Sequence, residues 1–364
     1  GACTEAGSSI DPQAVRPGDG GGVADAPPDP PDTPFPLDGP PYAHTTPQDM
    51  SPTVAGVPTR VYVPNSESNT VDVIDPATFK VIDHYPVGKV PQHVTPSWNL
   101  RHLFVNNNGS NSLTPIDPKT GRPGRPIPVS DPYNLYFTPD GSRAIVVAER
   151  LKRLDIRDPH TFAPIASIPI SHSGVDHLDF SADGSYLLVS AEFSGWVVRV
   201  DLNKRAVTGE VKVGGSPIDV KLSPDGSVFF VANQTRNGVS VIDPARMTET
   251  SFIPTAKGAH GLYYSRDLKS LYVSNRGDGS VSVIDVASRT VRTIWRFGGT
   301  PDMGGVSADG SQLWLAGRYS AAVYVIDTRD GRLLARIRVG NGPHGLCLFP
   351  QPGRFSLGHT GVYR

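Results

Sequence analysis

The chain has 364 residues, with 38 Gly, 36 Pro, two cysteines and a formal net charge of −1. Two cysteines exclude a disulfide-stapled scaffold, and the length suits two ordinary domains or one large all-β domain. No apolar run reaches the roughly 18 residues of a membrane-spanning helix. Lys and Arg are scattered rather than gathered in a stripe, which argues against a nucleic-acid partner.

Residues 1–59 are expected to form a linker or tether. They contain 13 Pro and 8 Gly, and eight acidic residues against the single base Arg16, so this segment carries −7 and residues 60–364 carry +6. Such a composition cannot bury enough apolar area to offset the entropy of ordering. The segment Phe35-Pro36-Leu37 and Tyr42 are the exception, and we expect them to lie against the following domain as an extended strap.

The first residues, Gly1-Ala2-Cys3 followed by small and polar residues, resemble the end of a bacterial lipoprotein signal, in which the cysteine is lipidated. We therefore expect an extracytoplasmic protein, anchored to the cell envelope through a lipid on Cys3 or secreted, with no other tie to a membrane. The alternative is an idle cysteine near a chain end.

From Arg60 onward the sequence repeats with a period near 42 residues. Seven segments of the type Val-Ile-Asp end 41 to 43 residues apart, at Asp75, Asp117, Asp158, Asp201, Asp243, Asp285 and Asp327. Within each unit an inner strand such as 217–222 meets an Asp-Gly turn, and a second strand, the Val-Ile-Asp strand and an outer strand follow. This pattern predicts an all-β fold, a seven-bladed β-propeller of four-stranded antiparallel blades over residues 60–353.

Three motifs carry a resemblance to the YVTN (YncE-like) family of β-propeller repeats. They are the strand ends at 61–65 and 271–275, the Val-Ile-Asp segments, and Pro-His-Gly at 343–345. The resemblance spans residues 60–353 and implies the propeller fold. It implies little about activity, because the family includes proteins with quite different roles.

The two ends of the repeat array are expected to complete one blade together. The first unit begins with a second strand at Val61 and lacks an inner strand, whereas the last unit ends with an inner strand at 343–349. Pairing these strands would remove the open edges of the ring. Residues 354–364 are then surplus, and they form either an extra strand that competes for closure or a cap on one face.

Candidate site residues follow from aligning the inner strands and the loops after the second strands. Side chains alternate along a strand, so equivalent positions should face a central tunnel or its mouth. This places at one mouth His93, His177, Asp219, His260, Asp302, His344, Arg276, Arg318, Glu149 and Glu192.

Three interpretations of this set remain open. The first is an ordinary solvated tunnel lined by polar residues. The second is a ligand site in which Arg276 and Arg318 clamp an anionic group, and the third is a metal centre for catalysis. We expect a monomer that binds a small molecule, a protein or a glycan, with a metal-assisted lyase or hydrolase as the alternative. The metal ligands would be His177, His260 and His344.

Relatives with this kind of repeat include a streptogramin lyase, lactonases and haem d1-binding domains. The resemblance implies a functional His among His177, His260 and His344. A divalent metal ion fits the sequence better than haem, because no Cys-Xaa-Xaa-Cys-His motif for covalent haem occurs. His359 near the C-terminus is expected to be solvated, and Cys347 to be an inert filler facing the tunnel.

Overall fold

The computed structural model describes residues 29, 31–359 and 361–364. A compact unit extends from Pro34 to Arg364, and residues Gly1–Thr33 form a separate unit. Cys3 lies outside the described residues, so its lipidation and the location of the protein stay predictions. In the described part of the chain no helix has the length and apolar character needed to cross a membrane.

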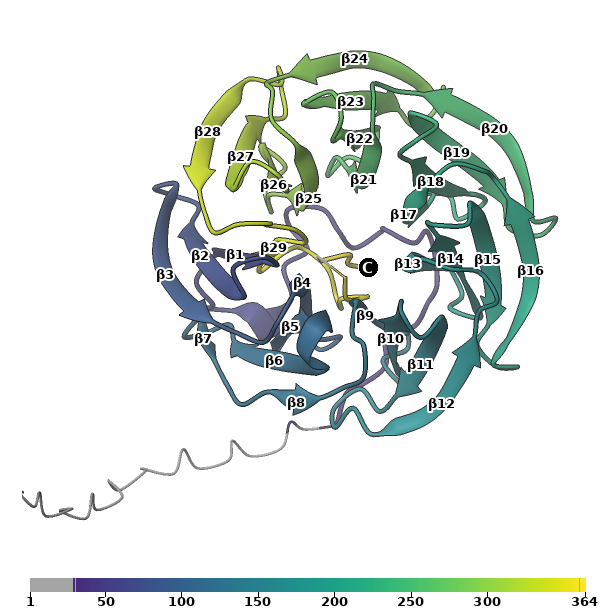
Figure 1. Ribbon diagram of the computed structural model, residues 1–364, viewed down its shortest axis with the longest axis horizontal. Coiled ribbons are helices and arrows are strands. Elements are labelled where there is room, and N and C mark those ends of the chain that lie inside the picture. The colour runs from purple at the N-terminus through teal and green to yellow at the C-terminus, as the bar shows by residue number, and fades with distance from the viewer. Residues whose placement is uncertain (1–28, 30, 360) are drawn as a thin grey trace, which may run out of the picture. The chain divides into compact units, whose positions relative to one another are not determined.

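Seven sheets stand around one axis within the compact unit, which confirms the predicted seven-bladed propeller (Figure 1). Six sheets have four strands and one has five. In chain order from the closing sheet, the first three comprise β29 (Cys347–Phe349), β1 (Arg60–Asn65), β2 (Thr70–Asp75) and β3 (Lys80–Pro86); β4 (Pro91–Pro96), β5 (Leu103–Asn107), β6 (Ser112–Asp117), β7 (Arg122–Pro123) and β8 (Ile127–Pro128); and β9 (Asn134–Phe137), β10 (Ala144–Ala148), β11 (Arg153–Arg157) and β12 (Pro164–Pro169).

The remaining four sheets follow the same pattern from inner to outer strand. They comprise β13 (Val175–Phe180), β14 (Tyr186–Ala191), β15 (Trp196–Asp201) and β16 (Ala206–Lys212); β17 (Pro217–Leu222), β18 (Phe229–Asn233), β19 (Gly238–Asp243) and β20 (Thr248–Pro254); β21 (Ala259–Tyr264), β22 (Ser270–Asn275), β23 (Ser280–Asp285) and β24 (Thr290–Arg296); and β25 (Pro301–Val306), β26 (Gln312–Gly317), β27 (Ala322–Asp327) and β28 (Leu333–Arg338). Among the described residues the only helices are two short 3₁₀ turns, η1 (Pro52–Val54) and η2 (Asn108–Ser110).

The hydrophobic cores lie between neighbouring sheets. Strands near the axis are buried throughout, as in β17, while outer strands such as β20 are mostly exposed. Leu222 and Phe229 of one sheet, for example, pack with Leu188 and Val197 of the sheet before it. Because both faces of each inner strand are covered, the inner strands are held at fixed positions around the axis.

The turn after the inner strand requires a left-handed backbone. Gly226 in the Asp-Gly turn has φ +73°, a conformation that costs glycine little. In two units the turn lacks glycine, and Leu100 (φ 64°) and Leu268 (φ 60°) occupy this region instead. The turn is therefore kept even where its sequence signal is lost, and Leu100 compensates by burying its side chain.

The ring is closed by strands from the two ends of the repeat array, as the sequence predicts. Strand β29 pairs antiparallel with β1, with Tyr62 opposite Cys347 and Arg60 opposite Phe349. The closing sheet therefore takes its inner strand from the end of the array and its other three strands from the beginning.

The segment after β29, residues 350–364, turns into the centre of the ring (Figure 1). It runs along the inner edge of β9, where the Phe137 amide donates to the Leu357 carbonyl at 2.9 Å and the His359 amide donates to the Leu135 carbonyl at 2.7 Å. Phe355 joins the core around β9 and β10. The C-terminal segment is thus an internal part of the propeller.

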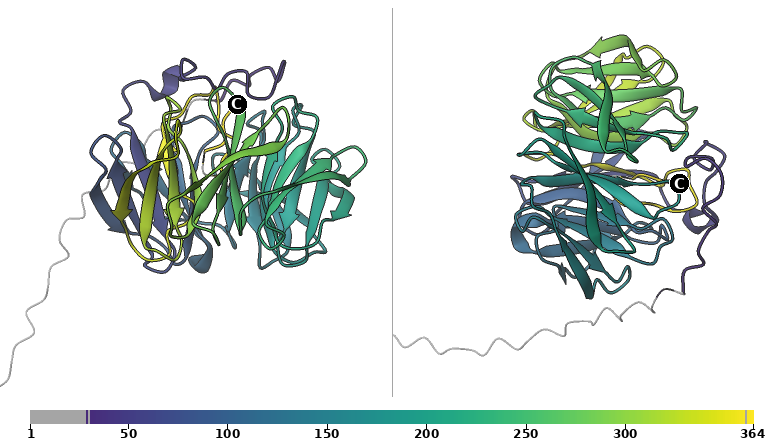
Figure 2. Two further views of the ribbon diagram at one scale, coloured as in Figure 1. Left: turned by 90° about the horizontal axis from the view of Figure 1, so that it is seen from above. Right: turned by 90° about the vertical axis from the view of Figure 1, so that its right-hand side faces the viewer.

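Residues 34–59 lie across the face from which the C-terminal segment enters (Figure 2). The Tyr42 hydroxyl donates to the Leu222 carbonyl at 2.9 Å, and the Tyr42 and Tyr264 rings lie 5.3 Å apart. Met50 forms a β-bridge with Gly353 of the C-terminal segment. The strap expected at Phe35–Tyr42 therefore packs on the propeller, although these residues fall in the range that the sequence assigns to the linker.

Candidate functional site

A repeated β-bulge aims side chains at the centre of the ring. In five sheets the register between the inner and second strands shifts at the start of the inner strand, between Pro91 and Val94 in β4 and at the equivalent places in β13, β17, β21 and β25. A bulge leaves its extra residues unpaired and redirects their side chains. The bulged residues include His93, His177, His260 and Asp302. We call the buried space that they surround the hub.

One group in the hub consists of His260, Asp302 and His344, named here the Asp302 group. Oδ1 of Asp302 lies 2.9 Å from Nε2 of His260 and 3.4 Å from Nε2 of His344. The Asp302 side chain is fully buried, and each His side chain is 5% exposed. These three residues could each give one ligand atom to a metal ion.

The hydrogen bonds around His260 determine which of its ring nitrogens carries a proton. Oε1 of Gln234 accepts a hydrogen bond from Nη2 of Arg276 at 2.6 Å, and an arginine can only donate. This oxygen also lies 3.0 Å from Nδ1 of His260, which must therefore be the N–H donor. In a neutral His260, Nε2 is then a lone-pair acceptor that faces the carboxylate of Asp302.

His344 repeats this arrangement, because its Nδ1 lies 3.1 Å from Oε1 of Gln92. Burial and the neighbouring Arg276 lower the pKa of His260 to about 4, and burial together with Arg318 holds the pKa of His344 well below its usual range. Both rings are therefore neutral near pH 7.

Asp302 is ionised in this setting. Burial by itself would raise its pKa, but the charge that His260 carries when protonated, and the permanent charge of Arg276, hold the pKa well below the usual range. Nη1 of Arg276 donates to Oδ2 of Asp302 at 2.9 Å, which leaves Oδ1 to the two imidazoles. Three electron-pair acceptors thus face one another with no proton between them.

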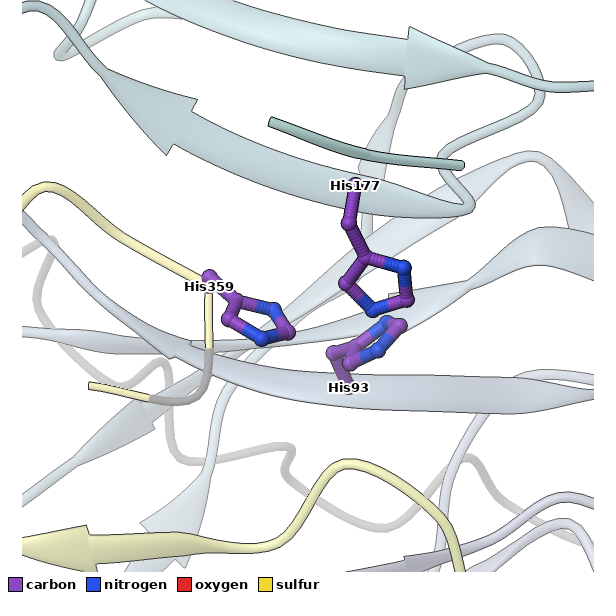
Figure 3. Close-up of side chains that lie close together, drawn as sticks. All are labelled: His93, His177 and His359. Atoms are coloured by element: carbon purple, nitrogen blue, oxygen red, sulfur yellow. The ribbon is translucent and has the colours of Figure 1, made fainter. Parts of the chain in front are cut away.

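A second group in the hub consists of His93, His177 and His359, named here the His359 group (Figure 3). The ring centroid of His93 lies 5.3 Å from that of His177 and 5.1 Å from that of His359, and the centroids of His177 and His359 are 4.8 Å apart. Potential ligand nitrogens of all three lie within 4.8 Å of one another. Burial and the charges of neighbouring histidines keep the pKa of both His93 and His359 well below the usual range.

The two groups are neighbours, since the rings of His93 and His344 are 4.7 Å apart. The metal set expected from the sequence is therefore distributed over both groups. His177 lies with His93 and His359, whereas His260 and His344 face Asp302.

The acidic cluster Glu149, Asp176 and Glu192 lies at the mouth, the end of the ring where the inner strands begin. Burial and then the charge of Asp176 raise the pKa of both Glu149 and Glu192 to about 8, and burial raises that of Asp176 to about 7. These carboxyl groups hold protons at neutral pH that exposed carboxyl groups would have released.

The acidic cluster gives the protein a pH-dependent stability. The folded protein binds protons at Glu149 and Glu192 up to about pH 8, whereas the usual value of 4.5 applies after unfolding. The free energy of unfolding should therefore fall as the pH rises through this range. We expect E149Q/E192Q to be more stable relative to the unsubstituted protein at about pH 9 than at about pH 6, by urea denaturation. An equal difference in stability at both pH values would contradict the raised pKa values of Glu149 and Glu192. The control is E67Q, at an exposed site.

Basic groups lie on the opposite part of the mouth. Nη1 of Arg318 is buried with no hydrogen-bond partner among the described residues, and Arg318 lowers the pKa of His344 through its charge. Lys257, Arg276 and Tyr319 line a pocket of about 520 Å³ that also reaches Gln234. Arg276 and Gln234 connect this pocket directly to the Asp302 group.

The remaining expected residue, Asp219, has a role between sheets. Its Oδ1 accepts from the Val220 amide at 3.0 Å and its Oδ2 from the Leu262 amide at 2.8 Å, and Oδ1 is 3.9 Å from Nε2 of His359. His359 itself is 1% exposed, so the expectation that it is solvated is wrong. Alignment of His359 with the end of a second strand did not reveal its burial, and the sequence did not indicate that the amides of Gln92, Gln234 and Asn134 lie beside the rings.

A family model described as YNCE-like beta-propeller matches residues 41–352. The chain belongs to the YncE-like β-propeller family. No curated protein sequence shows a significant match to it.

Solved structures similar to this YncE-like propeller share its fold at low sequence identity. A functionally unknown protein from Desulfotomaculum acetoxidans DSM 771 is 17% identical with a TM-score of 0.69, over 79% of this chain and 98% of that one. Dihydro-heme d1 dehydrogenase NirN is 16% identical (TM-score 0.61; 83% and 76%), and Kuenenia stuttgartiensis hydrazine synthase is 20% identical (0.59; 70% and 88%). Hydrazine synthase and NirN differ in activity, so the role of the hub in this YncE-like protein has to be inferred from the geometry of the hub itself.

Proposed function

We propose that this propeller binds a divalent transition-metal ion through His260, Asp302 and His344, and that the ion anchors a small anionic ligand at the mouth. One observation carries the proposal. Nε2 of His260 and of His344 both face Oδ1 of Asp302, at 2.9 and 3.4 Å, in a buried site. Three converging acceptors repel one another unless a cation lies among them.

A proton on His260 would be the other way to join these atoms. It would make His260 an imidazolium that donates to Asp302 through Nε2. The pKa of about 4 argues against this at neutral pH, because burial and Arg276 disfavour a further positive charge there. A metal ion placed among the three ligand atoms supplies the positive charge without protonating the ring.

The ligand set indicates the class of metal. Two imidazoles and one carboxylate suit borderline first-row ions such as Zn²⁺, Fe²⁺, Mn²⁺ or Co²⁺ better than Ca²⁺ or Mg²⁺. Gln234 and Gln92 hold the rings by their Nδ1 atoms, as outer-shell partners of metal-bound histidines commonly do. Three protein ligands leave a coordination position for an exogenous group.

The charges near the mouth favour an anion in that position. The partnerless Nη1 of Arg318 and the positive charges of Lys257 and Arg276 lie on the side of His344 and His260. A carboxylate or phosphate that bound the ion would also give Arg318 a charge-assisted hydrogen bond. The pocket of about 520 Å³ beside Arg276 has room for the rest of a small molecule.

Metal-assisted hydrolysis or elimination is the second candidate function. Glu149 and Glu192 have a pKa raised to about 8, close to the value that suits a general acid or base at neutral pH. Turnover of a lactone or ester that depends on both the added metal and Glu192 would support this function over simple binding.

Metal content tests the proposed ligand set. Protein stripped with a chelator and then equilibrated with Zn²⁺, Mn²⁺ or Co²⁺ should retain metal after gel filtration, measured by inductively coupled plasma mass spectrometry. H344Q should retain one ion fewer per chain. The control is H84Q, which removes an exposed histidine whose Nδ1 lies 2.5 Å from Asp72, outside the hub. Equal metal in H344Q and the unsubstituted protein would refute the proposal.

A further inference from the structure

We infer that His93, His177 and His359 form a second metal site, separate from the proposed Asp302 site, which is completed by the C-terminal segment. The three side chains come from β4, β13 and residues 350–364, and each is at most 2% exposed in the side chain or residue. Their ligand atoms lie within 4.8 Å of one another (Figure 3). None of these atoms belongs to the Asp302 group.

Each ring has a polar neighbour outside the cluster. Nδ1 of His93 donates to the Tyr133 carbonyl at 2.9 Å, whereas Nδ1 of His177 lies 2.8 Å from Oδ1 of Asp176 without forming a hydrogen bond to it. Nδ1 of His359 lies 3.0 Å from Nδ2 and 3.4 Å from Oδ1 of Asn134. Such outer-shell contacts fix the direction of a metal-binding imidazole.

The nitrogens on the other side of the rings have no hydrogen-bond partner. Nε2 of His93, His177 and His359 is buried in each case and forms no hydrogen bond to another described residue; Oδ1 of Asp219 lies 3.9 Å from that of His359. For His93 the N–H is used at Nδ1, so Nε2 carries a lone pair that points into the cluster. Burying three ring nitrogens without a partner is costly, and a shared metal ion bound by the three rings would offset that cost.

The ligand chemistry indicates zinc or copper. Three neutral imidazoles without a carboxylate suit Zn²⁺ or a copper ion and give little affinity for Ca²⁺ or Mg²⁺. Oδ1 of Asp219 lies 3.9 Å from Nε2 of His359, just outside the imidazoles.

His359 makes the site depend on the docking of the C-terminal segment. The His359 amide donates to the Leu135 carbonyl of β9, and the Phe137 amide of β9 donates to the Leu357 carbonyl. These hydrogen bonds hold the His359 imidazole in the hub. A metal ion bound by His359 would therefore also stabilise the docked segment, because binding free energy that requires the segment in place favours that state. This links metal loading to protection of the last residues of the chain.

The experiment counts Zn²⁺ and follows the segment separately. Unsubstituted protein saturated with Zn²⁺ should hold two ions, whereas H359Q and H93Q should each hold one ion and D302N should lose the other. Hydrogen–deuterium exchange at residues 354–364 should slow when Zn²⁺ is added to D302N, and this change should be absent in H359Q. Two histidine variants are used so that the test still gives a result if one of the substitutions prevents folding.

The outcomes separate this site from the Asp302 site. Two ions in H359Q and H93Q, or no change in exchange on adding Zn²⁺ to D302N, would overturn the second site. A single ion in the unsubstituted protein that H359Q removes and D302N keeps would support this site and refute the Asp302 site. In every case H84Q, the surface histidine control, should match the unsubstituted protein in metal content and in hydrogen–deuterium exchange.

Discussion

D302N should abolish metal binding at the Asp302 group while leaving the propeller folded. The substitution replaces the charged oxygen between His260 and His344 by a neutral amide. Loss of an outer-shell partner costs about 10–100-fold in metal affinity, and loss of the only charged ligand should cost more than that. Isothermal titration of the chelator-stripped protein with Zn²⁺ measures the effect.

The control for D302N is D131N. Asp131 is also a buried carboxylate with an arginine partner, since its Oδ1 lies 2.7 Å from Nε of Arg150, but no histidine of either group contacts it in this way. Both variants lose a buried charge, so a similar loss of stability is expected. Only D302N should lose the Zn²⁺ bound at the Asp302 group, and the same number of bound ions in the two variants would contradict the role given to Asp302.

R364A should lower the free energy of unfolding by about 3–5 kcal/mol, because it removes one partner of a buried ion pair. Nη2 of Arg364 lies 3.2 Å from Oδ1 of Asp179, and each side chain is 3% exposed. The guanidinium also donates to the Phe180 carbonyl at 2.7 Å and the Ser181 carbonyl at 3.0 Å. The substitution would leave Asp179 buried without its arginine and release the end of the C-terminal segment.

Urea denaturation compares R364A with R329A. Arg329 is also paired with an aspartate, at 2.8 Å from Asp327, but its side chain is 80% exposed. An exposed pair contributes little, so R329A should leave the unfolding midpoint nearly unchanged. If R364A behaves like R329A, the C-terminal segment is not held by Arg364 and the docking of His359 needs another explanation.

The repeats made the ring and the meeting of its inner strands predictable. A spacing near 42 residues and the unpaired strands at the two ends of the array led directly to seven sheets and to the pairing of β29 with β1. Aligned inner strands also brought His93 and His177 to one place, and His260 to the position before it, because equivalent positions of a symmetric ring lie near the same axis. Periodicity carries this information without any knowledge of packing.

The grouping of the histidines could not be predicted in the same way. Which rings face one another depends on the bulge at the start of each inner strand and on single amides such as Gln234, and neither follows from the repeat. His359 lies beyond the seventh repeat, and its alignment with the end of a second strand did not predict that it would be buried in the hub. Its burial results from the path of the C-terminal segment along β9, a contact between residues more than 200 positions apart.

The C-terminal segment connects the metal sites to the opposite face of the propeller. It begins beside the strap, where Met50 bridges Gly353, and it delivers His359 to the hub before ending at Arg364 on Asp179. Tyr42 of the strap bonds to Leu222, and its ring lies under Arg364. The strap and the segment thus lie together on one face, and the pocket beside Arg276 lies at the mouth.

Anomalous diffraction at the zinc absorption edge, from crystals of protein equilibrated with Zn²⁺ at neutral pH, tests the central claim most directly. The account predicts a peak within bonding distance of Oδ1 of Asp302 and of Nε2 of both His260 and His344. A hub without any such peak, in which Nε2 of His260 still lies at hydrogen-bond distance from Asp302, would show that a proton joins them and would contradict the metal site.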